Sequence, residues 1–336
     1  MAILYSNITG AYLFSDSFEI AEKIEFSKDK IISNNELLEQ GEWLEEEKEL
    51  IQKQKDKVLY IGFKKEPQNN TDIMWNQDAF SKISQKLKEN KEESEKLRQN
   101  NIIIAKNKIK KSVKKDLLVM QTINHIEELN KISNMMAKRL REWYELYNPE
   151  FSKSLDSHEK FTELIIQKDK KELLAEIGAD QATTMGADLE KEDVEAIIEF
   201  AKELQQVFEL RQKQTDYLET IMKQVCPNVL EITGPTIGAN LISLAGSLKK
   251  MSEFPASTIQ MLGAEKALFR HLKTGARPPK YGVLINHPYI MKADRKNKGK
   301  VARLVADKIS IASKVDYFKG EFVGDKLKAD IEKRLK

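Results

Sequence analysis

The sequence contains one cysteine, Cys226, and only four histidines among 336 residues. A single cysteine excludes an internal disulfide framework, and no cysteine or histidine cluster has the spacing of a zinc site. No apolar run reaches the roughly 20 residues that span a bilayer, and the first residues lack the pattern of a secretory signal. These absences predict a cytoplasmic protein with neither a metal site nor a membrane segment.

Glycine and proline are scarce in the first two thirds of the chain. No glycine occurs between Gly62 and Gly178, whereas nine of 14 glycines and six of eight prolines follow residue 226. This distribution predicts long helices first and a region of compact turns later. Short β-like runs before Gly62 flank a helical segment over about 35–54, which predicts a small α/β domain over residues 1–112. Residues 82–115 are rich in lysine and glutamate and predict a solvated helix or linker.

The near-neutral total charge conceals a polarised chain. Residues 227–336 contain 21 Lys and Arg against 10 Asp and Glu, a net charge of +11. Residues 1–226 carry a net charge of −8, which gives the overall charge of +3. A positive field concentrated in one region attracts phosphate backbones. We therefore expect residues 227–336 to form a domain that binds nucleic acid.

Two stretches have the heptad pattern of a coiled coil. Apolar positions average a spacing of 3.5 from Val119 to Tyr147, and they alternate steps of three and four from Val194 to Val225. Each helix would be roughly 45 Å long at about 1.5 Å per residue. We expect an antiparallel coiled-coil hairpin over residues 113–226 whose apolar stripe forms a homodimer; the alternative is a hairpin packed only within its own chain. The residues assigned to dimerisation are Ile126, Leu140, Trp143, Val194, Ile197, Leu204, Phe208 and Leu218.

A basic helix is expected directly after Gly263. One face of it would carry Lys266, Phe269, Arg270 and Lys273. The opposite face, with Leu268 and Leu272, would dock on the core and leave the cations free for phosphates. A phenylalanine at this spacing is more often buried than used for stacking, so the cations are the stronger candidates.

A second basic element surrounds Gly299, at the start of another expected helix. Unpaired amides at such a helix start attract phosphate, although a run of charges is also typical of an ordinary solvated face. Between the two elements lies a turn stiffened by two prolines, Pro278 and Pro279. The cations of the turn and of the second element are Arg277, Lys280, Arg295, Lys298, Lys300 and Arg303.

The sequence offers little for an enzyme. The four histidines are scattered, and no nucleophile lies near a base along the chain. The segment from Gly234 to Gly238 resembles part of a phosphate-binding loop, but it lacks the Gly-Lys-Ser/Thr ending. We expect a protein that catalyses no reaction.

Several motifs after residue 116 form one extended pattern. They are Leu140-Arg-Glu-Trp-Tyr-Glu-Leu-Tyr-Asn-Pro-Glu150, Pro227-Asn-Val-Leu, Ile237-Gly-Ala, Pro255-Ala-Ser-Thr-Ile-Gln-Met-Leu-Gly-Ala-Glu-Lys-Ala-Leu-Phe269, Pro279-Lys-Tyr-Gly282, His287-Pro288 and Gly299-Lys-Val-Ala-Arg303. Over at least residues 116–320 the chain resembles the Nop proteins, which form the core of box C/D small RNA ribonucleoproteins, in their archaeal form. It departs from the usual pattern at Cys226 and at Asn240, where a cation is absent. No Lys/Asp/Glu-rich tail of the nucleolar kind follows, which also favours the archaeal form.

This resemblance implies a mainly α-helical, modular scaffold. Its N-terminal domain would dock the methyltransferase fibrillarin, its coiled coil would self-associate, and its all-helical Nop domain would bind box C/D guide RNA. The RNA would be recognised at a kink-turn that already holds a ribosomal-type protein. Fibrillarin would bind S-adenosylmethionine and carry out ribose 2′-O-methylation in rRNA processing, so this chain itself would need no cofactor. The residues carried over to RNA and protein recognition are Gln260, Glu265, Lys266, Arg270 and Lys273, with Asn286 and His287 as polar RNA contacts.

Two other functions remain open on the sequence. A splicing-type Nop-domain protein would clamp RNA and protein without a methyltransferase partner, although the N-terminal α/β segment argues against it. A coiled-coil spacer with no RNA role would tolerate charge reversal at Lys266 and Arg270.

Overall fold

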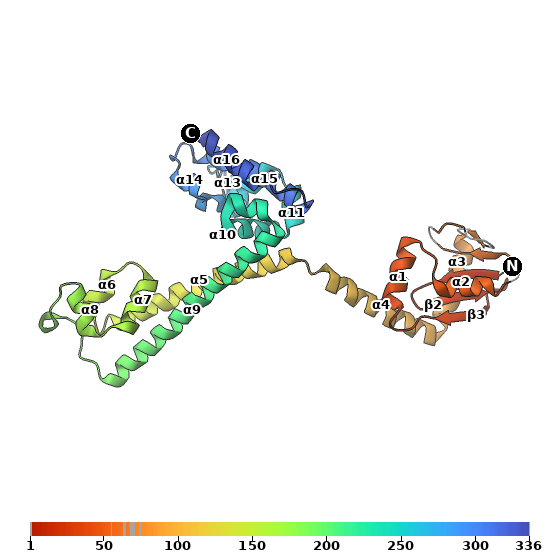
Figure 1. Cartoon of the computed structure of the whole chain (residues 1–336), viewed down its shortest axis with the longest axis horizontal. Coiled ribbons are helices and arrows are strands. Elements are labelled where there is room, and N and C mark those ends of the chain that lie inside the picture. The colour runs from red at the N-terminus through yellow and green to blue at the C-terminus, as the bar shows by residue number, and fades with distance from the viewer. Residues whose placement is uncertain (1, 55, 63–64, 68–70, 74–75, 336) are drawn as a thin grey trace. The chain divides into compact units, whose positions relative to one another are not determined.

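The computed structural model describes residues 2–54, 56–62, 65–67, 71–73 and 76–335. The chain divides into two compact units, Met1–Val113 and Lys114–Lys336. The first holds a small sheet with helices, and the second consists of helices only in its described residues (Figure 1). The expected fold class, mainly α with a small N-terminal α/β domain, is confirmed. None of the described helices combines the length and apolarity that crossing a bilayer requires.

A five-stranded sheet organises the first unit. Its strands are β1 (Ala2–Ser6), β2 (Gly10–Phe14), β3 (Ile20–Glu25), β4 (Val58–Tyr60) and β5 (Thr71–Ile73), in the order β3-β2-β1-β4-β5. Strands β1, β2 and β3 pair antiparallel, whereas β4 pairs parallel with β1 and β5. The apolar runs of the sequence predict the first four strands. They miss β5, because its three residues include a single large apolar side chain.

Four helices accompany the sheet: α1 (Ile31–Gln40), α2 (Glu45–Gln52), α3 (Gln77–Glu89) and α4 (Lys91–Ser112). Alternate residues of β1 face opposite sides, so Ile3 packs in a cluster with Ile83 of α3, and Leu4 packs with Leu50 of α2. The single helix expected over residues 35–54 is in fact two helices. Gly41 ends the first in the left-handed conformation, with φ 80°, which a residue with a side chain rarely adopts.

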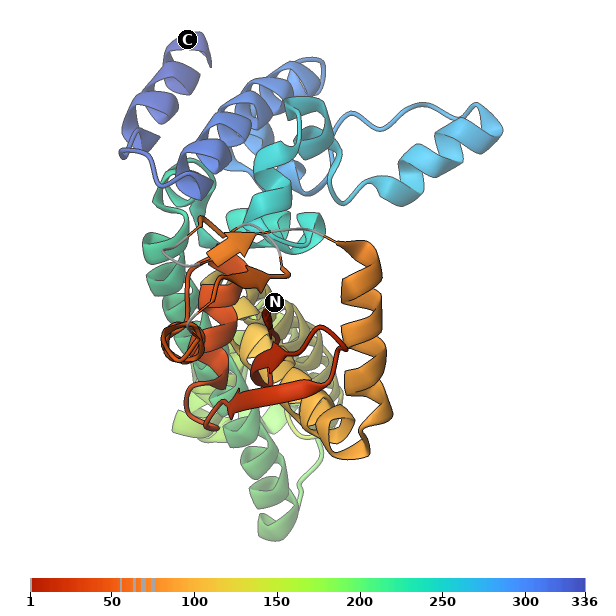
Figure 2. The same ribbon diagram turned by 90° about the vertical axis from the view of Figure 1, so that its right-hand side faces the viewer.

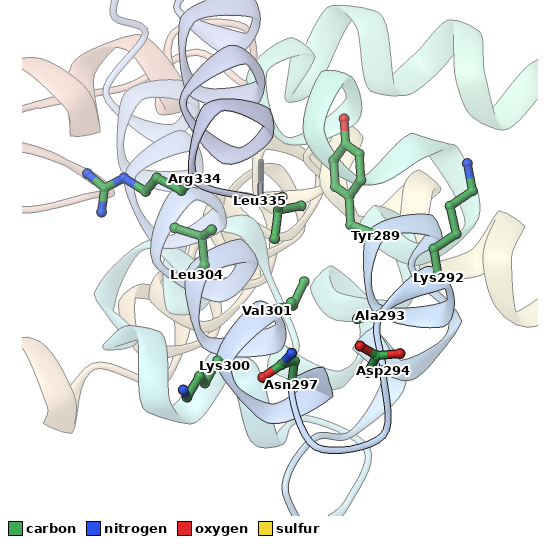
Figure 3. A pocket seen from close by; sticks show the side chains of 10 residues that line it. All are labelled: Tyr289, Lys292, Ala293, Asp294, Asn297, Lys300, Val301, Leu304, Arg334 and Leu335. Carbon is green, nitrogen blue, oxygen red and sulfur yellow. The ribbon is translucent and has the colours of Figure 1, made fainter.

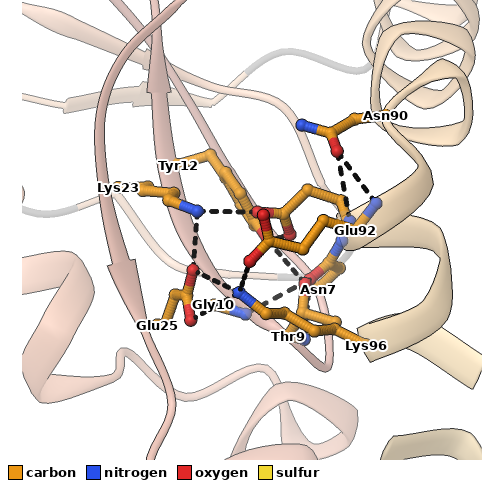
Figure 4. Close-up of polar contacts among 10 residues, drawn as sticks. Asn7, Thr9, Gly10, Tyr12, Lys23, Glu25, Asn90, Glu92 and Lys96 are labelled. Atoms are coloured by element: carbon orange, nitrogen blue, oxygen red, sulfur yellow. Dashed lines mark hydrogen bonds and ion pairs between the residues drawn. The ribbon is translucent and has the colours of Figure 1, made fainter. Parts of the chain in front are cut away.

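A polar network around the buried carboxylate of Glu93 holds the first turn of α4 against the sheet (Figure 4). The hydroxyl of Tyr12 donates to the Glu93 carboxylate at 2.7 Å, and the Lys23 ammonium lies 2.8 Å from the same carboxylate. Glu93 is only 4% exposed, and burial raises the pKa of Tyr12. Lys23 and Lys96 also pair with Glu25 at 2.6 and 2.9 Å. Because a buried carboxylate is costly without such partners, these contacts fix where α4 begins.

A long antiparallel hairpin begins the second unit. Its arms are α5 (Lys115–Tyr144, 30 residues) and α9 (Lys191–Val225, 35 residues). At the far end of the hairpin the connecting segment forms α6 (Pro149–Ser154), α7 (His158–Gln167), α8 (Lys170–Glu176) and the 3-10 turn η1 (Gln181–Thr183). Arg141 anchors this segment to α5, because its guanidinium donates to His158 Nδ1 at 2.9 Å and to the Leu155 carbonyl at 2.7 Å.

The seam between the two arms is closed within one chain. Ile126 and Leu140 of α5 are buried, as are Ile197, Leu204 and Leu218 of α9. Val194 and Phe208 are half-buried, and Trp143 is 40% exposed. The dimerisation residues expected from the heptads are therefore mostly used inside the hairpin.

The seam expected for α5 is wrong at Ile132 and Trp143, although Leu140 between them is buried as expected. Ile132 is 42% exposed, and Ser133, Ala137 and Tyr144 occupy the buried positions instead. A straight helix of 3.6 residues per turn drifts away from a strict 3.5 repeat, and the small side chains of Ser133 and Ala137 allow α9 to approach closely. The shift leaves Ile132 and Trp143 outside the seam.

The C-terminal helices form a bundle on the base of the hairpin. They are α10 (Pro227–Ala245), α11 (Leu248–Glu253), α12 (Ala256–Met261), α13 (Glu265–Thr274), the 3-10 turn η2 (Val283–Asn286), α14 (Pro288–Lys292), α15 (Lys298–Tyr317) and α16 (Gly324–Leu335). One core joins Val119 and Leu218 of the hairpin to Val229, Ile259 and Ala306 of the bundle. The finer division at residue 226 into a coiled coil and a Nop domain therefore stays a prediction.

Helix α10 has three marked features. Cys226 lies buried at its start, where burial raises the pKa of the thiol. The carboxylate of Asp316, on α15, accepts hydrogen bonds from the amides of Asn228 at 3.1 Å and Val229 at 2.9 Å. Further along, Gly234 has φ 70° and interrupts the helix before a proline.

Candidate nucleic-acid interface

Helix α13 stands away from the rest of the bundle. Figure 2 shows α13 and the loop that follows it extending to one side of the other C-terminal helices. None of its residues is buried; Phe269 is 61% exposed and Leu272 is 69% exposed. The expectation that the face with Leu268 and Leu272 docks on the core is wrong for Leu272, whereas Leu268 is half-buried. The helix presents its cations together with Phe269 and Leu272 to solvent.

Glycines set both ends of α13. The helix follows Gly263, with φ 84°, and ends at Gly275, with φ 67°. The Gly263 amide donates to the Glu265 carboxylate at 2.7 Å. Glu265 therefore has a local structural partner, and this bond orients the first turn of the helix.

The loop after α13 is fixed to the end of α12. The Gln260 side-chain amide donates to the Lys280 carbonyl at 2.6 Å, and the Gly282 amide donates to the Gln260 carbonyl at 2.9 Å. A β-carbon on Gly282 would lie 1.8 Å from the Leu262 carbonyl oxygen, so only glycine allows this approach. Gln260 thus positions Lys280 rather than projecting freely.

Five cations lie along α13 and its loop: Lys266, Arg270, Lys273, Arg277 and Lys280. All five are exposed, and none lies within 4.0 Å of a carboxylate among the described residues. By contrast, Lys308 and Lys328 elsewhere in the bundle pair with Asp330 and Glu231, each at 2.6 Å. Cations with no internal partner remain available for phosphate.

The second basic element lies where α15 begins. Arg295, Lys300 and Arg303 are exposed and Lys298 is half-buried, with no ion pair of theirs among the described side chains. A β-carbon on Gly299 would lie 3.6 Å from Cδ of Lys280, so the α13 loop reaches the start of α15. The structure therefore places the loop that follows α13, with Lys280, against the second basic element.

The two polar candidates after the loop are placed differently. Asn286 is exposed at the end of η2. His287 is 2% exposed; its Nε2 donates to the Ile232 carbonyl at 2.8 Å, and its Nδ1 accepts from the Tyr289 amide at 3.3 Å. With both ring nitrogens used inside the bundle, His287 has no free group for RNA, and the expected contact is corrected to a structural role.

The described residues show no cluster of metal-binding side chains. No three His, Cys, Asp or Glu side chains within the described ranges converge as metal ligands would. The sequence pattern identifies Lys292 as a cation near Gly299, but it gives no indication of Tyr289, which lines a cavity together with Lys292 beside the second basic element. The signal for Tyr289 is weak, because the cavity forms only when three separate helices meet.

A protein-family model described as "snoRNA binding domain, fibrillarin" matches residues 125–336, and it carries the name Nop. An uncharacterized NOP5 family protein of Methanocaldococcus jannaschii is 39% identical over 235 residues, 66% of this chain and 56% of the relative. Nucleolar protein 56 of Saccharomyces cerevisiae is 39% identical over 251 residues, 68% of this chain and 50% of the relative. The chain thus spans about half the length of these curated relatives.

Among solved structures, one entitled "crystal structure of fibrillarin/Nop5p complex" aligns with the chain. The alignment covers 99% of this chain and 98% of the other, with 21% sequence identity and a TM-score of 0.43.

Proposed function

The chain belongs to the Nop family, and on this basis we propose that it is a scaffold protein of a box C/D ribonucleoprotein. It bridges a kink-turn guide RNA, together with its bound ribosomal-type protein, to the methyltransferase fibrillarin. Ribose 2′-O-methylation is then carried out by fibrillarin with S-adenosylmethionine, and this chain contributes binding and positioning but no catalytic group.

The observation that carries the proposal is the state of α13. Its cations Lys266, Arg270 and Lys273 lack carboxylate partners among the described residues, while Phe269 and Leu272 stay exposed beside them. A surface for RNA alone needs cations, and a surface for protein alone is usually poor in them at its centre. A helix that offers both fits a composite target in which RNA and a bound protein lie side by side.

The family description supports fibrillarin as a partner of the chain, because it names fibrillarin beside the snoRNA-binding domain. The matched region begins at residue 125, so the first unit itself lies outside it. We assign fibrillarin docking to residues 1–112 because this α/β unit is separate from the RNA-binding helices. Retention of fibrillarin on a fragment of residues 1–113, and not on residues 114–336, tests that assignment.

We further propose that two copies of the chain associate through the outer side of the hairpin. Met135 is 67% exposed, and Trp143 packs beside Phe200 with ring centroids 6.4 Å apart while remaining 40% exposed. Leu146, in the turn that follows α5, is 62% exposed. This apolar stripe favours a second copy, because the seam inside the hairpin is already closed.

Reconstitution provides the test. The full chain is combined with a kink-turn RNA, the ribosomal-type protein and fibrillarin, and methyl transfer to a guided RNA target is measured. We expect transfer only when all four components are present. Transfer that proceeds equally well without this chain would refute the scaffold role.

A further inference from the structure

A cavity of about 550 Å³ lies between α14, the start of α15 and the end of α16. Figure 3 shows its lining from close by, with Val301 at the centre and Lys300 and Lys292 on opposite sides. Its volume falls within the range of about 300–1,000 Å³ typical of small-ligand sites. Of its lining residues, Lys300 also belongs to the second basic element described above, but the cavity itself has no role in the functions assigned so far.

The lining combines three kinds of chemistry. Val301, Leu304 and Leu335 supply apolar surface. Asp294 and Asn297 lie together at one edge, and their side chains make no hydrogen bond or ion pair within the described residues. The two lysines, Lys292 and Lys300, are exposed and likewise unpaired there. An apolar floor, a hydrogen-bonding edge and flanking cations match the three parts of a nucleotide: the faces of its base, the edge of its base, and its phosphate.

The position of Tyr289 is fixed by a neighbouring helix. Its hydroxyl donates to the Glu332 carboxylate of α16 at 2.6 Å, and burial raises the pKa of this phenol to about 12. The phenol therefore stays protonated and keeps this bond at neutral pH. A ring that is held in place loses little freedom when a base packs against it.

The cavity continues the basic surface of α13. Lys280 of the α13 loop lies against Gly299, where a β-carbon would be 3.6 Å from its Cδ, and Lys300 is the next residue. The main chain at Gly299 has no side chain to obstruct a strand that passes from Lys280 to Lys300. The loop that follows α13 thus places Lys280 beside Lys300, which lines the cavity.

We propose that this cavity binds one unstacked nucleotide of a single-stranded RNA segment. That segment extends from the part of the RNA that α13 contacts. The proposal rests on the RNA role of the chain proposed above, and it adds a second contact with a different chemistry. Charge attracts the strand to α13, whereas the cavity selects a base that has left its helix. Unpaired bases are the usual target of such pockets, because bases within a duplex are stacked and inaccessible.

The test uses the full chain and a single-stranded RNA octanucleotide of mixed sequence with a 3′ fluorescein, followed by anisotropy. Leu304→Glu places a carboxylate in the floor of the cavity. Ile311→Glu is the matched control, because Ile311 lies seven residues further along α15 and is 40% exposed outside the cavity. We expect Leu304→Glu to weaken binding of the octanucleotide at least about fivefold, which is the lower end of the affinity lost when one base-stacking contact is removed. We expect Ile311→Glu to change the affinity by less than about twofold.

A second variant, Asn297→Ala, leaves the hydrophobic core unchanged. Asn297 is exposed and makes no side-chain capping bond to α15, so its loss leaves the fold intact. We expect this variant to change the ratio of affinities for oligoadenylate and oligouridylate, because an edge amide distinguishes bases. Circular dichroism confirms that each variant is folded.

Three outcomes would overturn the proposal. The first is that Leu304→Glu and Ile311→Glu weaken RNA binding equally. The second is that Asn297→Ala leaves the preference between oligoadenylate and oligouridylate unchanged. The third is that adenosine monophosphate binds in the cavity without competing with the octanucleotide. The last would assign the cavity to a free nucleotide. A separate assay of Lys266→Glu/Arg270→Glu on the kink-turn complex distinguishes failure of the cavity from failure of the proposed function, because that complex depends on α13.

Discussion

The Nε2 atom of His287 donates a hydrogen bond to the main-chain carbonyl of Ile232, 2.8 Å away, at the point where α10 bends. The bend arises at Gly234 and Pro235, which interrupt the regular hydrogen bonds of the helix. His287 therefore replaces a partner that the helix cannot supply. Its other ring nitrogen accepts from the Tyr289 amide, so the pair of bonds requires the neutral imidazole.

Stability should depend on pH through His287. Burial, followed by the nearby charge of Lys328, lowers the pKa of His287 below its ordinary value of 6.5. The unfolded chain then binds the proton more readily than the folded chain. The contribution of His287 is fully present above pH 6.5 and is lost as the pH falls below it. Denaturant unfolding from pH 8 to pH 5 should show this loss, and the part due to His287 should be absent in His287→Gln.

Charge reversal on α13 should abolish capture of the RNA complex. Lys266→Glu/Arg270→Glu replaces two unpaired cations by carboxylates that repel phosphate. In a gel-shift assay with kink-turn RNA and its ribosomal-type protein, we expect loss of the shifted band. For the unmodified chain, the logarithm of affinity should fall with the logarithm of salt by about 0.7–0.9 per phosphate neutralised. Lys314→Glu, at an exposed position near the far end of α15, is the control and should retain the band.

Gly282→Ala should displace the α13 loop. The alanine β-carbon would lie 1.8 Å from the Leu262 carbonyl oxygen. Because that oxygen belongs to the main chain, the clash can be relieved only by a shift of the loop that carries Lys280. We expect a lower unfolding midpoint together with weaker capture of the kink-turn complex. Gly299→Ala is the contrasting change, because a β-carbon there meets nothing closer than 3.6 Å. It should stabilise the first turn of α15 by about 0.5–1 kcal/mol.

Solution mass tests the association of two copies. Sedimentation equilibrium at micromolar concentration should give twice the 38.7 kDa of the chain. Trp143→Glu, in the proposed contact stripe, should reduce the mass to that of one chain. Met185→Glu changes a side chain that is 82% exposed outside the stripe and should leave the dimer intact. A mass of 38.7 kDa for the unmodified chain would eliminate the dimer.

Asp316→Ala should destabilise the second unit without touching the RNA surface. Its carboxylate accepts from two amides at the start of α10 and from the Asn228 side chain at 2.7 Å. Loss of these bonds should lower the free energy of unfolding by roughly 1–3 kcal/mol. The same change at Asp307, which is exposed on the same helix, should cost much less. Equal costs for the two variants would contradict the capping role.

Regular patterns in the sequence predicted the long elements well. The uneven glycine distribution and the heptads place both arms of the hairpin, and the apolar runs place four of the five strands. The predictions fail where packing depends on residues that carry no hydrophobic signal. Ser133 and Ala137 complete the seam of α5 because they are small, and no periodicity of large apolar residues could reveal them.

The candidate site was predictable in its charges but not in its geometry. Counting cations identifies residues 227–336 and the two basic elements, because charge is a property of composition. The exposure of Phe269 and Leu272 was not predictable, because amphipathic spacing normally indicates a buried face. The burial of His287 depends on a carbonyl 55 residues away, and the cavity beside Lys300 depends on three helices that meet only in the folded chain.

The sole thiol of the chain is shielded at the junction of α9 and α10, and its raised pKa keeps it protonated and slow to react. Maleimide labels would therefore leave Cys226 untouched in the native protein. Cysteines engineered at one exposed position in each unit would accept a fluorophore pair selectively. Energy transfer could then report how the two units move as RNA and fibrillarin are added, while the native cysteine stays in place.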